Sequence, residues 1–573
     1  MSKKIFFILF FISFNLFSQV NINPEYINLG SKIDATLKSK VLKNTKYGIS
    51  IFSLTKNTQV FSYNSKETLT PASTTKLFTS FAFMEKFGAD YKLSTDIYID
   101  GKISNGILIG DLYIRGGGDS FLSLNDIETI ADQISAYGIK EINGNIYGDG
   151  SLFDNITERI DYSGDRDLVQ ATPPITALSI NRNIATVLVS SANSKTNKNN
   201  IQVIPPSDAF DVSQGNETFE ANPPLAKVKA EAPPKKIASN VVNKKVITKI
   251  PIKSKKVIAK PKINPKSKSK VNSKKVVTKK ATAKSSKKKK RYTYITPELE
   301  QLYGEKRKAS VKNKANKTVS PKAFVSSTIN PDGSQSFRVN GRVSKKSSAS
   351  YSHFIKNPVY TAAGTLKNRL VSGGIKVSGK IGEKAISAAK SPLKIFTFSR
   401  STLEIIQQLM KHSDNYLSET LFKTLGALTK TKGNDVVSAQ NLILHYIDSL
   451  KFDCRDCIVN DGSGLSRRNK LSAESMTNLF RSANNQPFFK SLDTSLSIAA
   501  VDGTLANRMW DPKTRFNLRA KTGTHGNVSA LTGLVKTQDG ELLTFSFIFN
   551  GPNVNAYKAI ENELGTILAN YSK

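Results

Sequence analysis

The stretch YGISIFSLTKNTQVFSYNSKETLTPASTTKLFTSFAFMEKFG, residues 47–88, joins a strand pattern to a helix pattern. Apolar and polar residues alternate over 47–63 on both sides of Lys56-Asn57, which is typical of a β-hairpin. Thr70-Pro71-Ala72-Ser73 interrupts the strand. Apolar residues then recur at helical spacing up to Gly88, namely Leu77, Phe78, Phe81, Met84 and Phe87. The pattern predicts strand, turn and buried helix, with Ser73 at the N-terminus of the helix.

The N-terminal residues 1–18 read MSKKIFFILFFISFNLFS, with Lys3 and Lys4 before an apolar run. The run is shorter than the about 18 residues that a membrane-spanning helix needs. The positive start and apolar centre predict a secretory signal peptide, and therefore an exported, periplasmic protein. An uncleaved N-terminal anchor is the alternative.

The amino-acid composition of the remaining chain changes several times. Short apolar stretches separated by Gly, Asn and Asp predict a mainly β region, whereas a Pro/Lys/Ser/Val-rich tract cannot bury enough apolar surface to fold and is expected to be disordered. Strand-like sequence resumes at 323–343, and the chain again looks compact and α/β from 393 onward. The predicted parts are 1–18 (signal peptide), 19–90 (first compact part), 91–204 (β-rich), 205–322 (disordered), 323–392 (β-rich, continued) and 393–573 (second compact part).

The net charge of +39 is concentrated in one tract. Residues 227–317 hold 29 Lys and 2 Arg against 4 Glu, so this tract carries +27 and the other 482 residues carry +12. We therefore expect no dedicated nucleic-acid site. A mobile polycation of this kind is expected to bind anionic envelope polymers or lipid head groups, and a passive linker is the alternative.

The residue types exclude several kinds of chemistry. The four His residues, at 353, 412, 445 and 525, are far apart and lack paired metal-ligand spacing, and the chain has no phosphate-binding G-x-x-x-x-G-K-[ST] loop. We expect neither a metal nor another cofactor. Nucleophilic chemistry without His then requires a Ser that another base activates.

Ser73-Thr74-Thr75-Lys76 supplies such a pair, because residues i and i+3 lie on one face of a helix. The pattern is common by itself, since Ser53/Lys56 and Ser267/Lys270 repeat it. Only Ser73 is at a helix N-terminus, where backbone N–H groups stabilise a developing oxyanion.

Two further motifs follow in the chain. Ser413-Asp414-Asn415 stands between predicted helices at 401–412 and 416–428 and would, taken alone, be a turn. Lys521-Thr522-Gly523-Thr524 follows a polar strand at 515–520 and occurs once. Its Gly lets a substrate backbone approach closely, and its Lys and Thr side chains offer donors for a carboxylate.

Together, the three motifs in this order resemble the penicillin-binding D-alanyl-D-alanine carboxypeptidases/endopeptidases of the low-molecular-mass class C type. Segments 110–119, 174–181 and 461–467 add to the resemblance. The family's fold is α/β, a serine β-lactamase/transpeptidase-like domain with an antiparallel sheet flanked by helices and with mainly β inserted domains. The 340 residues between Ser73 and Ser413 fit these insertions, and the tract at 205–322 departs from the family pattern.

The resemblance implies that peptidoglycan stem peptides are the substrate and that β-lactams acylate the enzyme. Ser73 would be the nucleophile, and Lys76 its base, kept neutral by the Lys521 cation. Ser413 would relay a proton to the leaving amine, and Asn415 would hold the substrate amide. Lys521, Thr522 and Thr524 would bind the terminal carboxylate, and Gly523 would allow the substrate to approach closely. The N–H groups of Ser73 and Thr524 would form the oxyanion hole.

Three questions stay open at this point. A β-lactamase and a catalytically idle cationic binding protein are the alternative functions. The balance of carboxypeptidase and endopeptidase activity is the second question. The third is Cys454-x-x-Cys457, for which an exported protein favours a structural disulfide over a redox or zinc site.

Overall fold

The structure is a computed structural model. It describes residues 20–165, 170–191, 199–215, 323–343, 347–430 and 434–573, except 453 and 455. The expected signal peptide at 1–18 and most of the expected disordered tract, residues 216–322, lie outside the described residues. Within the described residues, no helix has the length and apolar character to span a bilayer.

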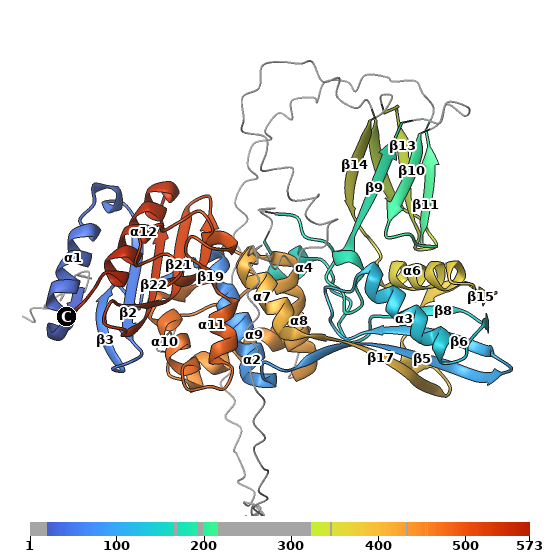
Figure 1. Cartoon of the computed structure of the whole chain (residues 1–573), viewed down its shortest axis with the longest axis horizontal. Helices are drawn as coiled ribbons and strands as arrows, with labels where there is room; N and C mark the ends of the chain where they lie inside the picture. The colour runs from blue at the N-terminus through green and yellow to red at the C-terminus, as the bar shows by residue number, and fades with distance from the viewer. Residues whose placement is uncertain are drawn as a thin grey trace, which may run out of the picture. The chain divides into compact units, whose positions relative to one another are not determined.

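N-terminal and C-terminal strands pair in one seven-stranded, fully antiparallel sheet (Figure 1). Its strand order is β1-β3-β2-β22-β21-β20-β19. The predicted hairpin supplies β2 and β3, and β2 pairs with β22 near the C-terminus. The strands are β1 (Val20–Ile22), β2 (Lys46–Ser53), β3 (Thr58–Tyr63), β19 (Ser497–Ile498), β20 (Arg519–His525), β21 (Val528–Lys536) and β22 (Leu542–Asn550).

Helices cover both faces of this sheet, because its strands alternate their apolar side chains between two cores. In β21, Leu531 and Val535 join the core under α1 and α12, whereas Ala530 and Leu534 join the core under the other helices. The predicted antiparallel sheet flanked by helices is confirmed. The helices are α1 (Ile27–Leu37), α2 (Lys76–Phe87), α7 (Thr402–His412), α8 (Asn415–Thr429), α9 (Asp435–Ser449), α10 (Ala473–Ala483), α11 (Phe489–Ser495) and α12 (Val554–Ala569).

The predicted buried helix is α2, and its entry differs slightly from the prediction. Residues Ala72–Thr75 form a 3-10 turn, η3, so that Ser73 lies in this turn and Lys76 is the first residue of α2. Nine of the twelve residues of α2 are buried, and its C-terminus is at Gly88, which has a positive φ of 83°.

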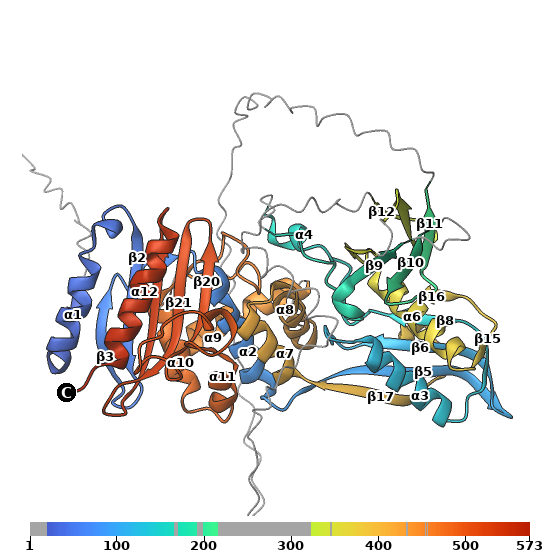
Figure 2. The same cartoon turned by 45° about the horizontal axis from the view of Figure 1, so that its top comes forward.

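All residues between β5 (Lys92–Ser104) and β17 (Pro392–Ser401) form an insertion between α2 and α7. The two strands pair antiparallel, with Lys92 opposite Ser401, so the chain leaves and re-enters the helical layer at one place (Figure 2). The predicted boundary at 393 falls inside β17.

The insertion is mainly β, as predicted. Its largest sheet is mixed, has the order β15-β7-β6-β5-β17 with β8 and β16 attached, and is joined by two three-stranded sheets, β10-β9-β14 and β11-β13-β12. The bounds are β6 (Ile107–Gly116), β7 (Glu141–Asn143), β8 (Ile146–Asp149), β9 (Ile184–Ser190), β10 (Asn200–Ile204), β11 (Phe210–Gln214), β12 (Phe324–Ile329), β13 (Gln335–Asn340), β14 (Ser348–Phe354), β15 (Lys376–Val377) and β16 (Ile381–Glu383).

Two details of the insertion correct the sequence-based expectations. Strand β11 pairs with β13, so packed structure continues past the predicted boundary at 205. The insertion also contains helix α3 (Leu124–Ala136) beside α6 (Pro358–Ser372). Helix α3 begins at a Ser123–Asp126 capping box, a signal that the sequence analysis overlooked.

Cys454 and Cys457 are bonded to each other, as favoured above, and both are buried beside Phe452 in the core of the helical layer. The disulfide follows α9 and precedes the loop 461–466, which contributes to the site described below.

We predict that Gly426→Ala destabilises the protein. A Cβ at this position of α8 would lie 1.7 Å from the carbonyl oxygen of Asp435, at the start of α9. We expect the free energy of unfolding to fall by about 3 kcal/mol, as in other overpacked interiors. Gly526→Ala is the control, because its Cβ meets nothing within 4 Å, and surface changes of this kind stay within about 0.5 kcal/mol. Equal unfolding midpoints for both variants in denaturant would contradict the α8–α9 packing.

Candidate active site

The amine of Lys76 is the centre of the motif residues. Its side chain is fully buried, and Nζ contacts Ser73 Oγ at 3.1 Å, Asn415 Oδ1 at 2.8 Å and Ser463 O at 2.5 Å. A neutral amine has two N–H donors and one lone pair. As an ammonium group, Lys76 donates to all three oxygens. In the neutral form, the Asn415 and Ser463 oxygens, which can only accept, would take the two N–H groups, and the lone pair would face the Ser73 hydroxyl.

Burial favours this neutral form. Loss of solvation lowers the pKa of Lys76 to about 8, against the opposing effect of the Glu419, Asp461 and Asp414 carboxylates. The sequence analysis had ascribed the neutral amine to the Lys521 cation. The structure corrects the cause, because burial is the dominant effect on Lys76.

The second lysine, Lys521, is also fully buried and donates to Ser413 Oγ at 2.8 Å and to Thr522 O at 2.7 Å. Burial, followed by repulsion from the Lys76 cation, holds the pKa of Lys521 well below its ordinary value. Ser413 ends α7 in the left-handed conformation, with φ 56°. The turn between α7 and α8 therefore presents its hydroxyl to Lys521.

An ion pair connects this turn to the insertion. Asp414 caps α8 by accepting from Leu417 N at 3.0 Å, and its other carboxylate oxygen pairs with Arg182. Arg182 is the middle of three consecutive residues with positive φ, at 49°, 58° and 56° for Asn181, Arg182 and Asn183. Such strain persists only where the surroundings impose it. The insertion thus helps to hold the second motif in place.

The third motif lies within β20, which begins at Arg519, and not after a strand at 515–520 as predicted. The strand runs beside the turn that carries Ser73. A Cβ at Gly523 would lie 2.5 Å from Pro71 O and 3.2 Å from Ser73 N. The absence of a side chain at Gly523 is therefore required by the backbone of the turn that carries Ser73.

The structure brings together six of the eight predicted site residues: Ser73, Lys76, Ser413, Asn415, Lys521 and Gly523. The hydroxyl of Thr522 donates to Thr504 Oγ1 at 2.9 Å, and Thr524 is exposed at the same strand. Neither Thr hydroxyl contacts another predicted site residue.

Sequence reasoning missed the charged groups behind Lys76. Glu419 is fully buried on α8, and Asp461 is fully buried and pairs with Arg159 at 3.1 Å. No sequence signal singled out Glu419, because the run 416–428 also contains Ser418, Thr420, Lys423 and Thr424. Asp461 belongs to a segment quoted only for its family resemblance. Within the described ranges, no group of three or more acidic, His or Cys side chains is arranged to hold a metal ion.

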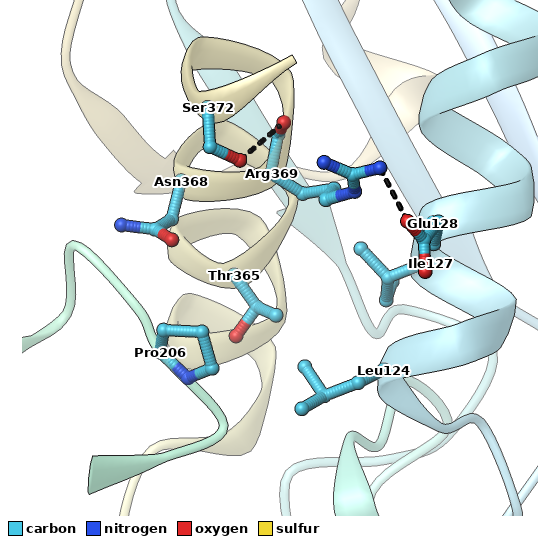
Figure 3. A pocket seen from close by; sticks show the side chains of 8 residues that line it. All are labelled: Leu124, Ile127, Glu128, Pro206, Thr365, Asn368, Arg369 and Ser372. Atoms are coloured by element: carbon cyan, nitrogen blue, oxygen red, sulfur yellow. Dashed lines mark hydrogen bonds and ion pairs between the residues drawn. The ribbon is translucent and has the colours of Figure 1, made fainter. Parts of the chain in front are cut away.

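A hollow of about 260 Å³ lies elsewhere, between α3 and α6 of the insertion (Figure 3). Leu124 and Pro206 line it on one side, and the ion pair between Arg369 and Glu128 crosses its other end. No residue of the three motifs lines this hollow.

Comparison with known proteins identifies the family of the chain. The model of the D-Ala-D-Ala carboxypeptidase 3 (S13) family matches residues 29–238 and 295–571. The chain belongs to this family. It is 24% identical over 552 residues to a D-alanyl-D-alanine carboxypeptidase of Actinomadura sp. (strain R39), covering 95% of this chain and 85% of that protein.

Two matches come from Haemophilus influenzae. The D-alanyl-D-alanine carboxypeptidase DacB is 22% identical over 545 residues, covering 94% of this chain and 90% of that protein. The crystal structure of penicillin-binding protein 4 from the same organism has a similar fold, with a TM-score of 0.60, 18% identity, and coverage of 95% and 100%. This S13 member is a serine-type D-Ala-D-Ala peptidase, so the two alternative functions left open by the sequence are set aside.

We predict that Gly523→Ala slows acylation of the serine in this S13 peptidase by about a hundredfold, the usual effect of losing one oxyanion donor. The new methyl group would push on the turn that presents Ser73 N. The measurement is the second-order rate of labelling by a fluorescent penicillin. Gly526→Ala, three residues further and open to solvent, should label at the wild-type rate. An unchanged rate in Gly523→Ala would contradict the proximity of β20 to this turn.

Proposed function

We propose that this peptidase cleaves D-Ala-D-Ala termini and D-Ala cross-links of peptidoglycan through an acyl-enzyme on Ser73. The three-partner contact of Lys76 carries the proposal, because it directs a lone pair at the Ser73 hydroxyl. Among the residues that the structure describes, no other Ser–Lys pair of this spacing leads directly into an α-helix.

Acylation begins when neutral Lys76 takes the proton of Ser73, whose Oγ attacks the carbonyl of the penultimate D-alanine. The N–H groups of Ser73 and Thr524 stabilise the oxyanion of the tetrahedral intermediate. Ser413 then relays a proton to the leaving amine, which departs as D-alanine or as the partner peptide. Water hydrolyses the acyl-enzyme in the second half of the reaction.

Substrate recognition couples to the base through charge. A terminal carboxylate bound beside Lys521, Thr522 and Thr524 favours the ammonium form of Lys521, whose pKa is otherwise held low by burial. A cation at Lys521 in turn disfavours a cation at Lys76. Carboxylate binding therefore promotes the neutral base that acylation needs. To bind the carboxylate, the Thr522 hydroxyl must give up its hydrogen bond to Thr504 Oγ1 and donate to the substrate.

β-Lactams are expected to acylate Ser73 by the same steps. A second structure of the Haemophilus influenzae penicillin-binding protein 4, in complex with a β-lactam, has the same fold as this chain, with a TM-score of 0.57 and 17% identity. Asn415 would hold the amide of a β-lactam side chain as it holds the substrate amide.

The cationic tract at 227–317 suits an exported enzyme that acts on an envelope polymer. Its +27 charge would attract anionic envelope polymers or lipid head groups, and salt would screen the attraction. We propose that it keeps the enzyme at the envelope, while the three motifs lie outside it.

The test of the proposed function is digestion of purified peptidoglycan. Ser73→Ala should abolish both penicillin labelling and peptide cleavage while the fold, checked by circular dichroism, is unchanged. Lys76→Ala should lose at least about 10³-fold, because it removes the base. Separation of monomers from cross-linked dimers distinguishes carboxypeptidase from endopeptidase products. Labelling of Ser73→Ala at the wild-type level would assign the nucleophile elsewhere.

The pKa of Lys76, about 8, predicts the pH dependence. Acylation requires the neutral amine, so its second-order rate should rise about tenfold per pH unit up to about pH 8 and level off above it. Stopped-flow acylation by a penicillin between pH 5.5 and 9.5 measures this profile. A rate independent of pH over this range would contradict a titrating lysine base.

Deletion of residues 227–317 tests the cationic tract. Penicillin acylation should stay within about twofold of wild type, and retention on envelope preparations at low salt should fall sharply, since screened attraction is lost. Full-length protein in high salt is the matched control and should also be released. Equal retention of both proteins at low salt would leave the tract as a linker only.

A further inference from the structure

A buried carboxylate lies directly behind the base. Glu419 is on α8, four residues after Asn415 and therefore on the same helix face. It accepts from Ser463 N at 2.9 Å, from Gly462 N at 3.4 Å and from the Tyr162 hydroxyl at 2.9 Å. Three neutral donors thus surround a carboxylate that is 0% exposed.

One residue separates this carboxylate from the amine of Lys76. The N–H of Ser463 donates to Glu419, and the carbonyl of the same Ser463 accepts from Lys76 Nζ at 2.5 Å. The charges of Glu419 and Lys76 interact strongly across this one residue, because neither side chain contacts solvent. Among the charges that raise the pKa of Lys76 against burial, the Glu419 carboxylate has the largest effect.

Unlike the two carboxylates nearest to it, Glu419 has no ion-pair partner among the described residues. Asp461 pairs with Arg159, and Asp414 pairs with Arg182, whereas in the described part of the chain no Lys, Arg or His forms an ion pair with Glu419. The titratable and charged groups facing Glu419 and Lys76 are Arg159 and Tyr162 of α4 (Arg159–Ser163), Asp461 of the loop 461–466, Asp414 of α8, and Lys521 and His525 of β20.

We propose that Glu419 is a positioning residue for the base: its charged carboxylate, acting across Ser463, holds Lys76 in the ammonium form and so sets the pH at which the enzyme becomes reactive. The proposal rests on the proposed role of Lys76 and deepens it. It also identifies Glu419 as a second titrating group of the site, since burial and the Asp461 anion raise the pKa of Glu419 to about 7.

Glu419→Gln is a conservative probe of this proposal. The Gln oxygen can still accept from Ser463 N, and its amide can donate to the Tyr162 hydroxyl oxygen, so two of the three contacts remain while the charge is removed. Only the long contact with Gly462 N, at 3.4 Å, is lost. Without the anion, Lys76 loses its proton at lower pH. We expect the acid limb of the acylation profile to move down by less than about one pH unit, because Glu419 is charged only above about pH 7 and affects Lys76 only there.

The experiment measures the acylation rate and the initial binding constant for a penicillin from pH 5.5 to 9.5. Between about pH 7 and pH 8, where Glu419 is charged and Lys76 titrates, Glu419→Gln should acylate about twofold faster than wild type, with equal rates on the plateau and equal initial binding. A purely structural role of Glu419 would lower the rate at every pH without moving the limb.

Glu561→Gln is the matched control, because Glu561 is equally buried, on α12, but is bonded to Ser529 and Arg508 and not to the loop beside Lys76. Its acid limb should stay at the wild-type pH. Tyr162→Phe removes one donor to the carboxylate, which raises the pKa of Glu419 and keeps it neutral over more of the pH range, so it should move the limb in the same direction as Glu419→Gln, by less.

An acid limb unmoved in folded Glu419→Gln overturns the proposal, and an unmoved limb in Tyr162→Phe overturns it if Glu419→Gln does not fold. Failure of the proposed function gives a different result: the wild-type protein itself would show no acid limb, or Ser73→Ala would still be labelled.

Discussion

The burial of one lysine amine is the constraint on which the site depends. Lys76 is the first residue of α2, and its Nζ is fixed by oxygens from three separate segments, at Ser73, Asn415 and Ser463. An amine without solvent and with two acceptors already placed has one remaining direction for its lone pair. In the neutral amine, that direction is toward the Ser73 hydroxyl.

This arrangement explains why a very long insertion leaves the site intact. The entry and exit strands β5 and β17 are paired, so α2 and α7 remain neighbours although about 300 residues separate them in the chain. The insertion also contributes to the site. Arg182 anchors the turn of the second motif, and Arg159 neutralises Asp461 beside the loop that holds Lys76.

Much of the fold could be predicted from the sequence, because alternating and helical apolar patterns directly reflect which faces are buried. The hairpin at 47–63 and the buried helix that follows it, α2, are examples. The strand predicted at 515–520 was misplaced, since polar residues at strand ends give no periodic signal. The sequence predicted which residues form the three motifs and their order along the chain. It did not predict the contacts between them.

The groups behind Lys76 were beyond sequence reasoning for a physical reason. A buried Glu419 or Asp461 looks like any polar residue until the fold removes its solvent and places it near an amine. The cause of the lowered pKa of Lys76 was misassigned for the same reason: burial depends on the packing of three segments, which no local motif contains.

The most direct test of the account is an NMR titration of the lysine side chains in the full-length protein, followed through the ¹³Cε resonances. Lys76→Arg assigns the signal of interest by its disappearance. The account predicts that this signal titrates with a midpoint near pH 8. A midpoint near the ordinary lysine value of about 10.4 would contradict it.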